Sequence, residues 1–356
     1  MPISDELALR PESGSELFVP HIGWLRYPSN DIVLLHLREG SFEFSEQAFL
    51  WSFLREEDIF LDIGAHCGLF SALASQIIGD AGRILAFEPN PDILPFLMAN
   101  TRRDRVDIHA VALSDASGEA IFWQGGTSDT ALSSIAYELP NSKHSMVETQ
   151  TLDDLLATLG MGQVALAKVD VEGSELKLFR GARKTLQKKT VLAFVVEFAE
   201  ENMRKAGYSA LELATQLIEY GYRPYKMAAE AADLVPFEVQ ESIEFENIFF
   251  THDLVAVLDR IRQAPIENAR RSKEIIGRGS ATEALVRSLW SMEKEAAKRL
   301  ALINDLAAEC RSRDQTIAEL RRRKRLSVVA RRLKRLFVRF GAWRRKRRSA
   351  SLSPTN

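Results

Sequence analysis

The sequence predicts an α/β fold: a mostly parallel, seven-stranded sheet with helices on both faces, followed by a C-terminal α-helical coiled coil. Three observations lead to this prediction. From about Ile59 to Phe250, short apolar or β-branched runs alternate with amphipathic helical segments, which is typical of crossover-connected strands. A glycine-containing turn follows the first run. Beyond His252 the composition changes, and residues 284–323 are highly charged and contain no glycine or proline.

Seven segments have the strand pattern, and four helices are expected between them. The strands are predicted at 59–64, 83–89, 106–113, 164–171, 191–198, 222–227 and 242–251. The helices are predicted at 70–79, 92–102, 175–187 and 210–221, two of which end at a glycine, a common helix stop. These elements make up a domain over residues 58–255.

The flanking segments are read from their local patterns. Residues 1–57 precede the domain and are expected to hold a hairpin over 31–44 and a helix over 46–54. After the domain we expect a linker (256–281), a coiled coil (282–323), a basic amphipathic helix (324–348) and a disordered tail (349–356). In the coiled coil, apolar residues recur on alternating three- and four-residue steps, which predicts a homo-oligomer.

Composition restricts the class of protein. A chain of 356 residues with 46% hydrophobic residues can fill a sizeable core. The N-terminus does not read as a signal peptide, and no run of about 20 apolar residues predicts a membrane span. Cys67 and Cys310 offer neither a disulfide framework nor a CxxC pair. We therefore expect a cytoplasmic protein.

Charge is distributed unevenly although the net charge is only -2. Residues 321–356 contain 15 Lys and Arg and no Asp or Glu, which leaves 32 basic and 49 acidic residues in the rest of the chain. The basic helix at 324–348 has aromatic anchors, so an anionic membrane surface is its favoured partner, with peripheral attachment at the inner face. Nucleic acid and a protein groove are alternatives, and the acidic body disfavours nucleic acid.

The motif DIGAHCG (62–68) predicts a ligand-binding turn. Gly64 and Gly68 allow the chain to turn tightly and approach a ligand at a helix N-terminus. Glu88 ends the next predicted strand 20 residues beyond Gly68, where a carboxylate can accept both ribose hydroxyls. Asp62 precedes the first glycine and suits a cationic ligand better than a pyrophosphate. The motif therefore favours S-adenosylmethionine over NAD.

Several longer segments carry a family resemblance. DIGAHCG, AFEPNPDILPFLMAN, ALSD (112–115), KVDVEGSELKLFRGA (168–182) and VVEF (195–198) resemble the FkbM-type methyltransferases, over about residues 55–252. The resemblance implies a Rossmann-like class I methyltransferase fold. It also implies methyl transfer from S-adenosylmethionine, usually to oxygen and often on sugars or polyketide-type natural products.

The resemblance also implies roles for individual residues. Asp62, Gly64 and Gly68 would frame the methionine moiety, and Glu88 would bind the ribose. The adenine edge would meet Ser114 and Asp115. The expected cofactor site is completed by His66, which departs from the asparagine of many similar sequences, and by Asp170. Asn90 and Asn100 match family positions and are expected to be structural.

Three carboxylates are the candidate catalytic residues. Asp170 and Glu172 are expected on the same side of an extended segment at the end of 164–171, and Glu197 ends the next strand. Such a group can supply a general base for a hydroxyl. A divalent cation is the open alternative, and no metal site is assigned. A purely structural interpretation has Glu172 and Glu175 capping a helix and Glu197 pairing with a lysine.

Other candidates are weaker. His109 and His144 are alternative bases, although a lone histidine is more often structural. The loop over 125–145 is a candidate acceptor-binding lid.

Together these features predict an S-adenosylmethionine-dependent O-methyltransferase. The expected acceptor is a sugar hydroxyl of a glycan, polysaccharide or glycolipid precursor at the cytoplasmic membrane face. One alternative is a catalytically idle scaffold that binds an adenosine ligand within a glycan-synthesis complex. Another is a methyltransferase for a natural product or a nucleic acid; the chain has no NPPY- or DPPY-like motif to support the latter.

Overall fold

The computed structural model describes most of residues 14–279. The exceptions inside this range are residues 30, 40–41, 102–103, 127–129, 141, 229–232 and 242. The predicted coiled coil, basic helix and tail (282–356) lie outside the described residues and stay predictions.

The main sheet has eight strands in the order β12-β11-β13-β10-β9-β3-β4-β5. Their bounds are β3 (Ile59–Ile63), β4 (Arg83–Phe87), β5 (Val106–His109), β9 (Val164–Val169), β10 (Val191–Ala199), β11 (Arg223–Met227), β12 (Leu234–Pro236) and β13 (Phe245–Thr251). The five strands from β5 to β10 in this order are parallel, and β13, β11 and β12 are joined to them by antiparallel pairing. Each of the seven predicted strand segments contains a strand of this sheet, and β12 is the additional strand.

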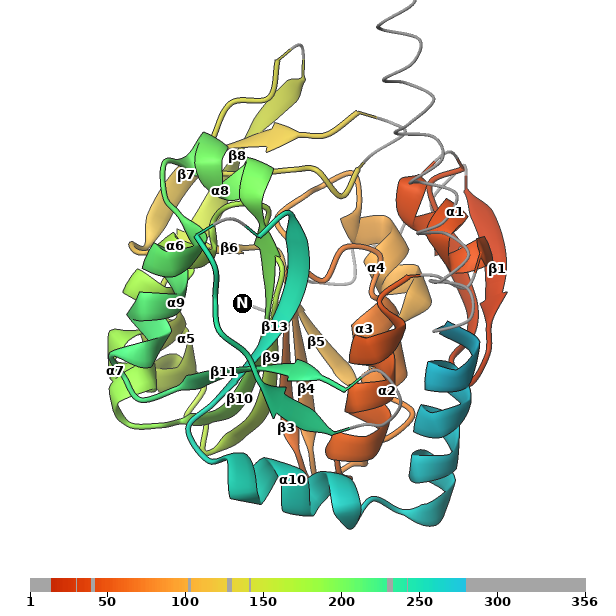
Figure 1. Cartoon of the computed structure of the whole chain (residues 1–356). Helices are drawn as coiled ribbons and strands as arrows, with labels where there is room; N and C mark the ends of the chain where they lie inside the picture. The colour runs from red at the N-terminus through yellow and green to blue at the C-terminus, as the bar shows by residue number, and fades with distance from the viewer. Residues whose placement is uncertain are drawn as a thin grey trace, which may run out of the picture. The chain divides into compact units, whose positions relative to one another are not determined.

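The predicted strand over 106–113 divides in two. Its second part, β6 (Ala112–Leu113), leaves the main sheet and pairs with β8 (Lys143–Gln150), which also pairs with β7 (Gly118–Gln124). This small sheet lies beside the main sheet, above its labelled strands in Figure 1. It carries the chain past the end of the main sheet, where the site described below is found.

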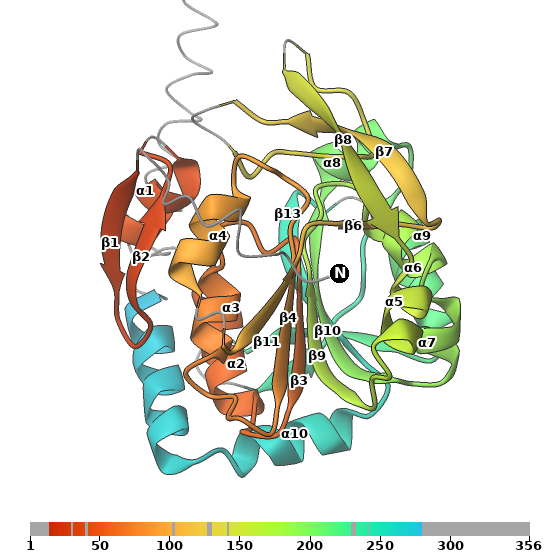
Figure 2. The same ribbon diagram turned by 180° about the vertical axis from the view of Figure 1, so that it is seen from behind.

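Helices cover both faces of the main sheet (Figures 1 and 2). One face is covered by α2 (Phe44–Phe53), α3 (Leu69–Ala74) and α4 (Leu94–Asn100), and the other by α5 (Leu152–Thr158), α6 (Glu175–Arg180), α7 (Arg183–Gln187) and α9 (Ala210–Ile218). Successive strand residues point to opposite faces, so Phe60 of β3 joins the core under the first group, while Leu61 and Ile63 join the core under the second. Both faces are therefore apolar and buried.

The N-terminal segment corrects one prediction. The hairpin lies over β1 (Ser15–Val19) and β2 (Gly23–Tyr27), and the segment from Ile32 to Glu39, placed in a hairpin by the sequence, is helix α1. Val33 and Leu34 are buried and Leu37 packs against the same core, which is a helical spacing. The prediction of a hairpin over 31–44 was therefore wrong.

The predicted linker over 256–281 is also largely helical. Helix α10 (Leu254–Arg262) packs on α2, and residues 266–279 are helical as well. Arg260 pairs with the carboxylate of Asp58. Gly279 lies directly against the ring of Phe44, where an added Cβ would come within 2.0 Å of the ring. This segment thus packs against the start of α2.

A further helix, α8 (Glu200–Ala206), follows β10.

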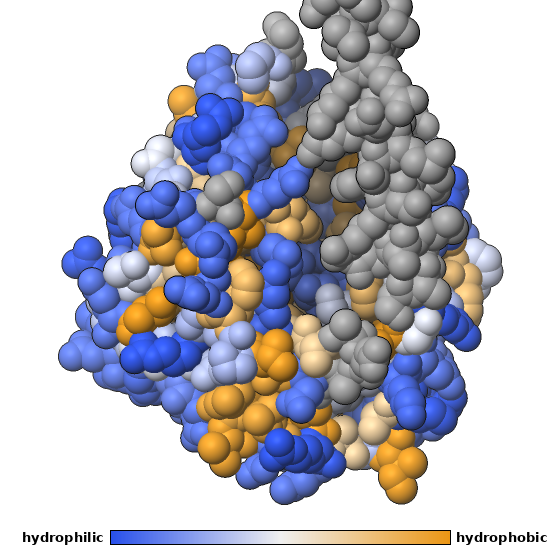
Figure 3. Space-filling model, viewed as in Figure 1, coloured by the Kyte–Doolittle hydropathy of each residue, from blue (hydrophilic) through white to orange (hydrophobic). Residues whose placement is uncertain are grey.

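The surface seen in Figure 3 is mostly hydrophilic, and hydrophobic residues gather toward its lower part, near α10. Val235 of β12 and Val255 of α10 are among the exposed large hydrophobic residues. Among the described residues, no helix has the length and apolar character needed to span a membrane. Scattered exposed apolar side chains of this kind are ordinary on protein surfaces.

The strand order reverses between β3 and β9. From β3 the chain adds β4 and then β5 on one side, and it later adds β9 and then β10 on the other. Ligands of open α/β sheets bind beyond the carboxyl ends of the strands at this kind of switch point.

Candidate active site

The glycine turn after β3 lies at the switch point. The N–H groups of Gly64 and Ala65 both donate to the carbonyl of Phe87 at the end of β4, over 3.0 and 2.9 Å. Gly64 has φ +82°, and a Cβ there would be 1.7 Å from the carbonyl oxygen of Asp170. The turn therefore needs glycine at this position for both its conformation and its close contact with the end of β9.

Glu88 is the buried carboxylate that the sequence placed beside this turn. Its two oxygens accept from the backbone N–H groups of His66 (2.9 Å) and Asn90 (2.7 Å). Burial raises the pKa of Glu88 to about 7, although the two N–H donors oppose the rise. Each carboxylate oxygen keeps a lone pair for a further donor such as a ribose hydroxyl. Asn90 is thus structural, as expected.

A pocket of about 880 Å³, including its open mouth, lies at this edge of the sheet. Five of the predicted site residues line it: Gly64, His66, Glu88, Asp170 and Glu172. Five others are not among its lining residues: Asp62, Gly68, Ser114, Asp115 and Glu197.

Asp62 and Gly68 support the turn from outside the pocket. The carboxylate of Asp62 is buried and accepts a 2.6 Å hydrogen bond from the hydroxyl of Ser71 on α3. Burial raises the pKa of Asp62. Gly68 begins α3 with φ +86°, and a Cβ there would clash with Leu97. Both residues therefore hold the turn against the neighbouring helices.

Ser114 and Asp115 lie behind the pocket wall. The carbonyl of Ser114 is so close to Gly181, between α6 and α7, that a Cβ on the glycine would be 2.0 Å away. The Ser114 hydroxyl donates to Asp115 at 3.2 Å. The pocket is instead lined by the apolar residues just before them, Val111, Ala112 and Leu113. The predicted contact of Ser114 and Asp115 with the adenine edge stays a prediction.

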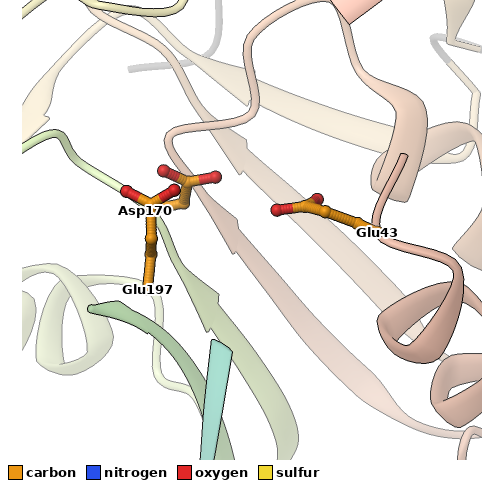
Figure 4. A group of neighbouring side chains, drawn as sticks. All are labelled: Glu43, Asp170 and Glu197. Carbon is orange, nitrogen blue, oxygen red and sulfur yellow. The ribbon is translucent and has the colours of Figure 1, made fainter. Parts of the chain in front are cut away.

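Three carboxylates converge at the side of the pocket nearest α2 (Figure 4). Oxygens of Glu43, Asp170 and Glu197 all lie within 4.8 Å of one another. Asp170 follows β9 and Glu197 lies near the end of β10, as predicted, whereas Glu43 enters from the segment before α2. Burial, with Asp170 and Glu172 nearby, raises the pKa of Glu197 well above its usual range. Burial likewise raises the pKa of Glu43 to about 8, against the opposing charge of Lys168.

Lys168 is the cation of this cluster, and it was not among the site residues predicted from sequence. It lies on β9 beside Asp62 of β3, on the face that holds Phe70. Its ammonium is 2.6 Å from Asp170 and 3.6 Å from Glu43. Burial alone would lower the pKa of Lys168, but these carboxylates raise it above its usual value. The signal in the sequence was a lysine within an otherwise apolar strand.

Glu172 is placed differently from the prediction. It is not in an extended segment: its φ is +50°, and its side chain accepts a hydrogen bond from Asn202. Glu175 accepts from the N–H groups of Val171 and Gly173, and also from the hydroxyl of Tyr208 at 2.6 Å. Asp170 and Glu172 therefore do not share one side of a strand, and Glu175 has the structural capping role that was the alternative.

The candidate lid reaches the cofactor turn. Nε2 of His66 is 2.8 Å from the hydroxyl of Thr130, and that hydroxyl donates to the buried carboxylate of Asp31. Further along the loop, the hydroxyl of Ser134 donates to the carbonyl of Glu172 at 2.6 Å. Thr130, Ala131, Ser133 and Ile135 line the pocket. This loop therefore closes one wall of the site; its residues 127–129 and 141 lie outside the description.

The two alternative bases are elsewhere. His109 is stacked on Phe87 and His144 is packed against Trp123, and neither is among the pocket residues. Their placement agrees with a structural role.

Comparison with known families agrees with the geometry. Residues 62–224 match the profile described as the methyltransferase FkbM domain. This segment holds the glycine turn, Glu88, Lys168 and two members of the carboxylate cluster. Residues 62–224 are an FkbM methyltransferase domain. Glu43 and Asp31 of the same site lie outside the matched segment.

The individual proteins to which this chain is similar have low sequence identity to it. A curated relative is the hexuronic acid methyltransferase AglP of Haloferax volcanii, 27% identical over 134 residues, which are 37% of this chain and 53% of AglP. The match thus spans about half the length of that relative. Among solved structures, an S-adenosylmethionine-dependent O-methyltransferase of Thermotoga maritima is 15% identical, with a TM-score of 0.32 and coverage of 59% of this chain and 64% of that one. Fibrillarin of Aeropyrum pernix is also 15% identical, with a TM-score of 0.32 and coverage of 68% and 85%.

The residues of the FkbM domain fit S-adenosylmethionine. Gly64 and Ala65 of the glycine turn line the pocket, so a ligand can approach the backbone there. Glu88 offers a buried carboxylate at the end of β4, where a ribose is held in folds of this kind. The apolar wall at Val111–Leu113 suits a purine ring, and the acidic side of the pocket suits the cationic methionine end.

Proposed function

We propose that this protein is an S-adenosylmethionine-dependent O-methyltransferase whose acceptor is a sugar hydroxyl. The observation that carries the proposal is the pairing, in one pocket, of the glycine turn and Glu88 with a converging group of carboxylates. The first half fits the cofactor and the second half can receive a proton from a hydroxyl. The FkbM domain supports the methyl transfer, and the name of the Haloferax relative supports a sugar acceptor.

In this reaction the main task of the protein is to position the acceptor relative to the methyl donor. When bound, S-adenosylmethionine supplies a methyl group already activated by its sulfonium. The chain has to hold an acceptor oxygen in line with that methyl and to take up the hydroxyl proton. Asp170 is the candidate base because it lines the pocket, where its contact with Lys168 fixes the position of the carboxylate. Oxygen gains the methyl as the O–H bond breaks, and the proton passes to the carboxylate.

The setting of the enzyme is part of the same proposal. A glycan, polysaccharide or glycolipid precursor at the cytoplasmic face of a membrane would suit the basic segment 324–348 as a peripheral anchor. Residues 282–323 would join copies of the chain. A natural-product acceptor is an alternative within the same chemistry, and an idle scaffold that binds the cofactor is the alternative without it.

Calorimetric titration of S-adenosylmethionine into the full chain and into Glu88→Ala tests the cofactor, with NADH titrated in parallel. We expect saturable binding to the wild type, loss of binding in Glu88→Ala, and no NADH binding. Glu119→Ala, at an exposed position of β7, is the control and should bind as the wild type does. Methyl transfer to hexose and hexuronic acid oligosaccharides then separates the enzyme from the scaffold. Binding without transfer to any acceptor favours the scaffold, and no binding contradicts both.

A further inference from the structure

The carboxylate cluster brings three acids together beside one lysine. Glu43, Asp170 and Glu197 contribute the carboxyl groups, and the Lys168 ammonium contacts two of them. The side chain of Glu43 is 8% exposed and that of Asp170 is 20% exposed. Buried carboxylates are costly unless they are paired, and a divalent cation can pair with all three at once.

Two oxygens at the cluster also lack hydrogen-bond partners. Oε2 of Glu43 is buried and accepts no hydrogen bond, on a side chain that is only 8% exposed; its nearest cation is the Lys168 ammonium at 3.6 Å. Oδ1 of Asn247 is likewise buried without a partner. Asn247 lies opposite Glu197 in the β10–β13 pairing and donates to the other oxygen of Glu43 at 3.2 Å. Buried oxygens usually have a partner, so these two point to a missing one.

The spacing of the oxygens suits a metal ion. Two ligand oxygens on opposite sides of a cation with bonds of about 2.1 to 2.4 Å are about 4.2 to 4.8 Å apart. The three carboxylate oxygens fall within 4.8 Å of one another. Figure 4 shows the side chain of Glu43 extending toward those of Asp170 and Glu197 from the opposite side of the gap. Ligands that are all oxygen select hard cations.

We propose that Glu43, Asp170 and Glu197, with the amide of Asn247 beside them, bind one Mg²⁺ or Mn²⁺ ion at the edge of the methyl-transfer pocket. Asp170 lines that pocket, so a cation held there is within reach of an acceptor. Binding of the ion does not depend on the proposed function, whereas the role of the ion in the reaction rests on that function. A cation bound to an acceptor hydroxyl makes its proton easier to lose, and a carboxylate of the site takes that proton.

Titration of MgCl₂ and MnCl₂ into the chelator-treated full chain, without S-adenosylmethionine, tests the site. We expect one saturable site in the wild type. Glu43→Gln should weaken binding by at least about tenfold, because even indirect partners of metal ligands contribute that much. Glu119→Gln is the control: Glu119 is an exposed acid on β7 and is not one of the cluster residues, and its variant should bind within about threefold of the wild type.

The outcomes are distinct. If the wild type binds neither metal saturably at millimolar concentrations, Lys168 alone neutralises the cluster and the proposal is overturned. Equal weakening by Glu119→Gln and Glu43→Gln also overturns it, because it shows a diffuse charge effect. If Glu43→Gln does not fold, a rise in the wild-type melting temperature with Mn²⁺, absent with the same concentration of Na⁺, decides the matter. S-adenosylmethionine binding is measured separately, so failure of the metal site and failure of the methyltransferase proposal give different results.

Discussion

The backbone N–H of His66 donates a 2.9 Å hydrogen bond to the carboxylate of Glu88. One contact thus joins the cofactor turn after β3 to the acid at the end of β4. Burial raises the pKa of the same carboxyl to about 7, so Glu88 changes its protonation near neutral pH.

Cofactor affinity should therefore depend on pH. A protonated Glu88 has fewer acceptor positions for ribose hydroxyls, so we expect the Kd for S-adenosylmethionine to fall as the pH rises from 6 to 8, and then to level off. Calorimetry at a series of pH values measures this. Glu88→Gln should bind more weakly and lose the dependence. A wild-type Kd that is flat over this range would refute the assignment.

The stability of the cofactor-free protein should fall as the pH rises, whereas its affinity for S-adenosylmethionine should increase. The unfolded chain releases the Glu88 proton near pH 4.5, whereas the folded chain holds it to about pH 7. The contribution of this carboxyl to stability is therefore full below pH 4.5 and is lost as the pH rises through 7. Melting temperatures should show a smaller decline between pH 5 and 8 in Glu88→Gln than in the wild type, and an equal decline would count against it.

Gly64→Ala should disable the cofactor turn. The substitution puts a Cβ 1.7 Å from the carbonyl oxygen of Asp170 at a backbone φ of +82°. The strained φ alone costs roughly 1 to 3 kcal/mol. We expect a lower melting temperature and loss of S-adenosylmethionine binding by calorimetry. Gly160→Ala is the control, because Gly160 has φ +60° but no atom within 4 Å of the added Cβ. It should lower stability and leave binding intact.

Thr130→Val should loosen the loop over the turn. Its hydroxyl is shared between His66 and Asp31, so the variant removes both contacts while keeping the shape of the side chain. We expect the Kd for S-adenosylmethionine to rise about five- to tenfold, which corresponds to roughly 1 kcal/mol for the hydrogen bonds lost. Thr215→Val, on α9, serves as the control. Unchanged affinity in Thr130→Val would mean that the loop does not hold the cofactor.

Substitution of Asp170 should lower the activity much more than substitution of Glu172. Asp170 contacts Lys168 and lines the pocket, whereas the Glu172 side chain is bound by Asn202. With an acceptor oligosaccharide that supports turnover, we expect Asp170→Asn to lower kcat by about 10² to 10⁴, the range for loss of a general base. Glu172→Gln should lower it by less than tenfold. Comparable losses in both variants would restore the grouping of the two acids that the sequence predicted.

The parts of the fold that were predictable are those with strong local patterns. Buried parallel strands read as continuous apolar runs, and the glycine turn of Gly64 and Gly68 follows the first of them. The N-terminal hairpin was missed because its turn contains His21 at φ +67° instead of an Asn-Gly or Asp-Gly pair. The helix at 32–39 was misread because its apolar residues form a short, nearly continuous run and a glycine follows, which is also the pattern of a strand before a turn.

In the site, too, the residues with a clear local sequence pattern were predicted and the others were not. Glu88 and Asp170 follow directly from strand ends, so they were identified from sequence. Glu43 could not be, since it reaches the cluster from a segment 127 residues before Asp170 and nothing local marks it as a site residue. Ser114 and Asp115 are not among the pocket residues for another reason: β6 turns away into a second sheet, which places the preceding apolar residues on the pocket wall.

The cluster around Glu43 has a practical consequence for any fragment of this protein. The matched domain boundaries, 62–224, contain Asp170 and Glu197 but neither Glu43 nor Asn247. A shorter chain cut at those boundaries would present the cofactor turn beside an incomplete acidic site, with Lys168 facing one carboxylate fewer. Such a fragment would also lack all of β13 and most of β3, so its inactivity would say nothing about the chemistry of the intact chain.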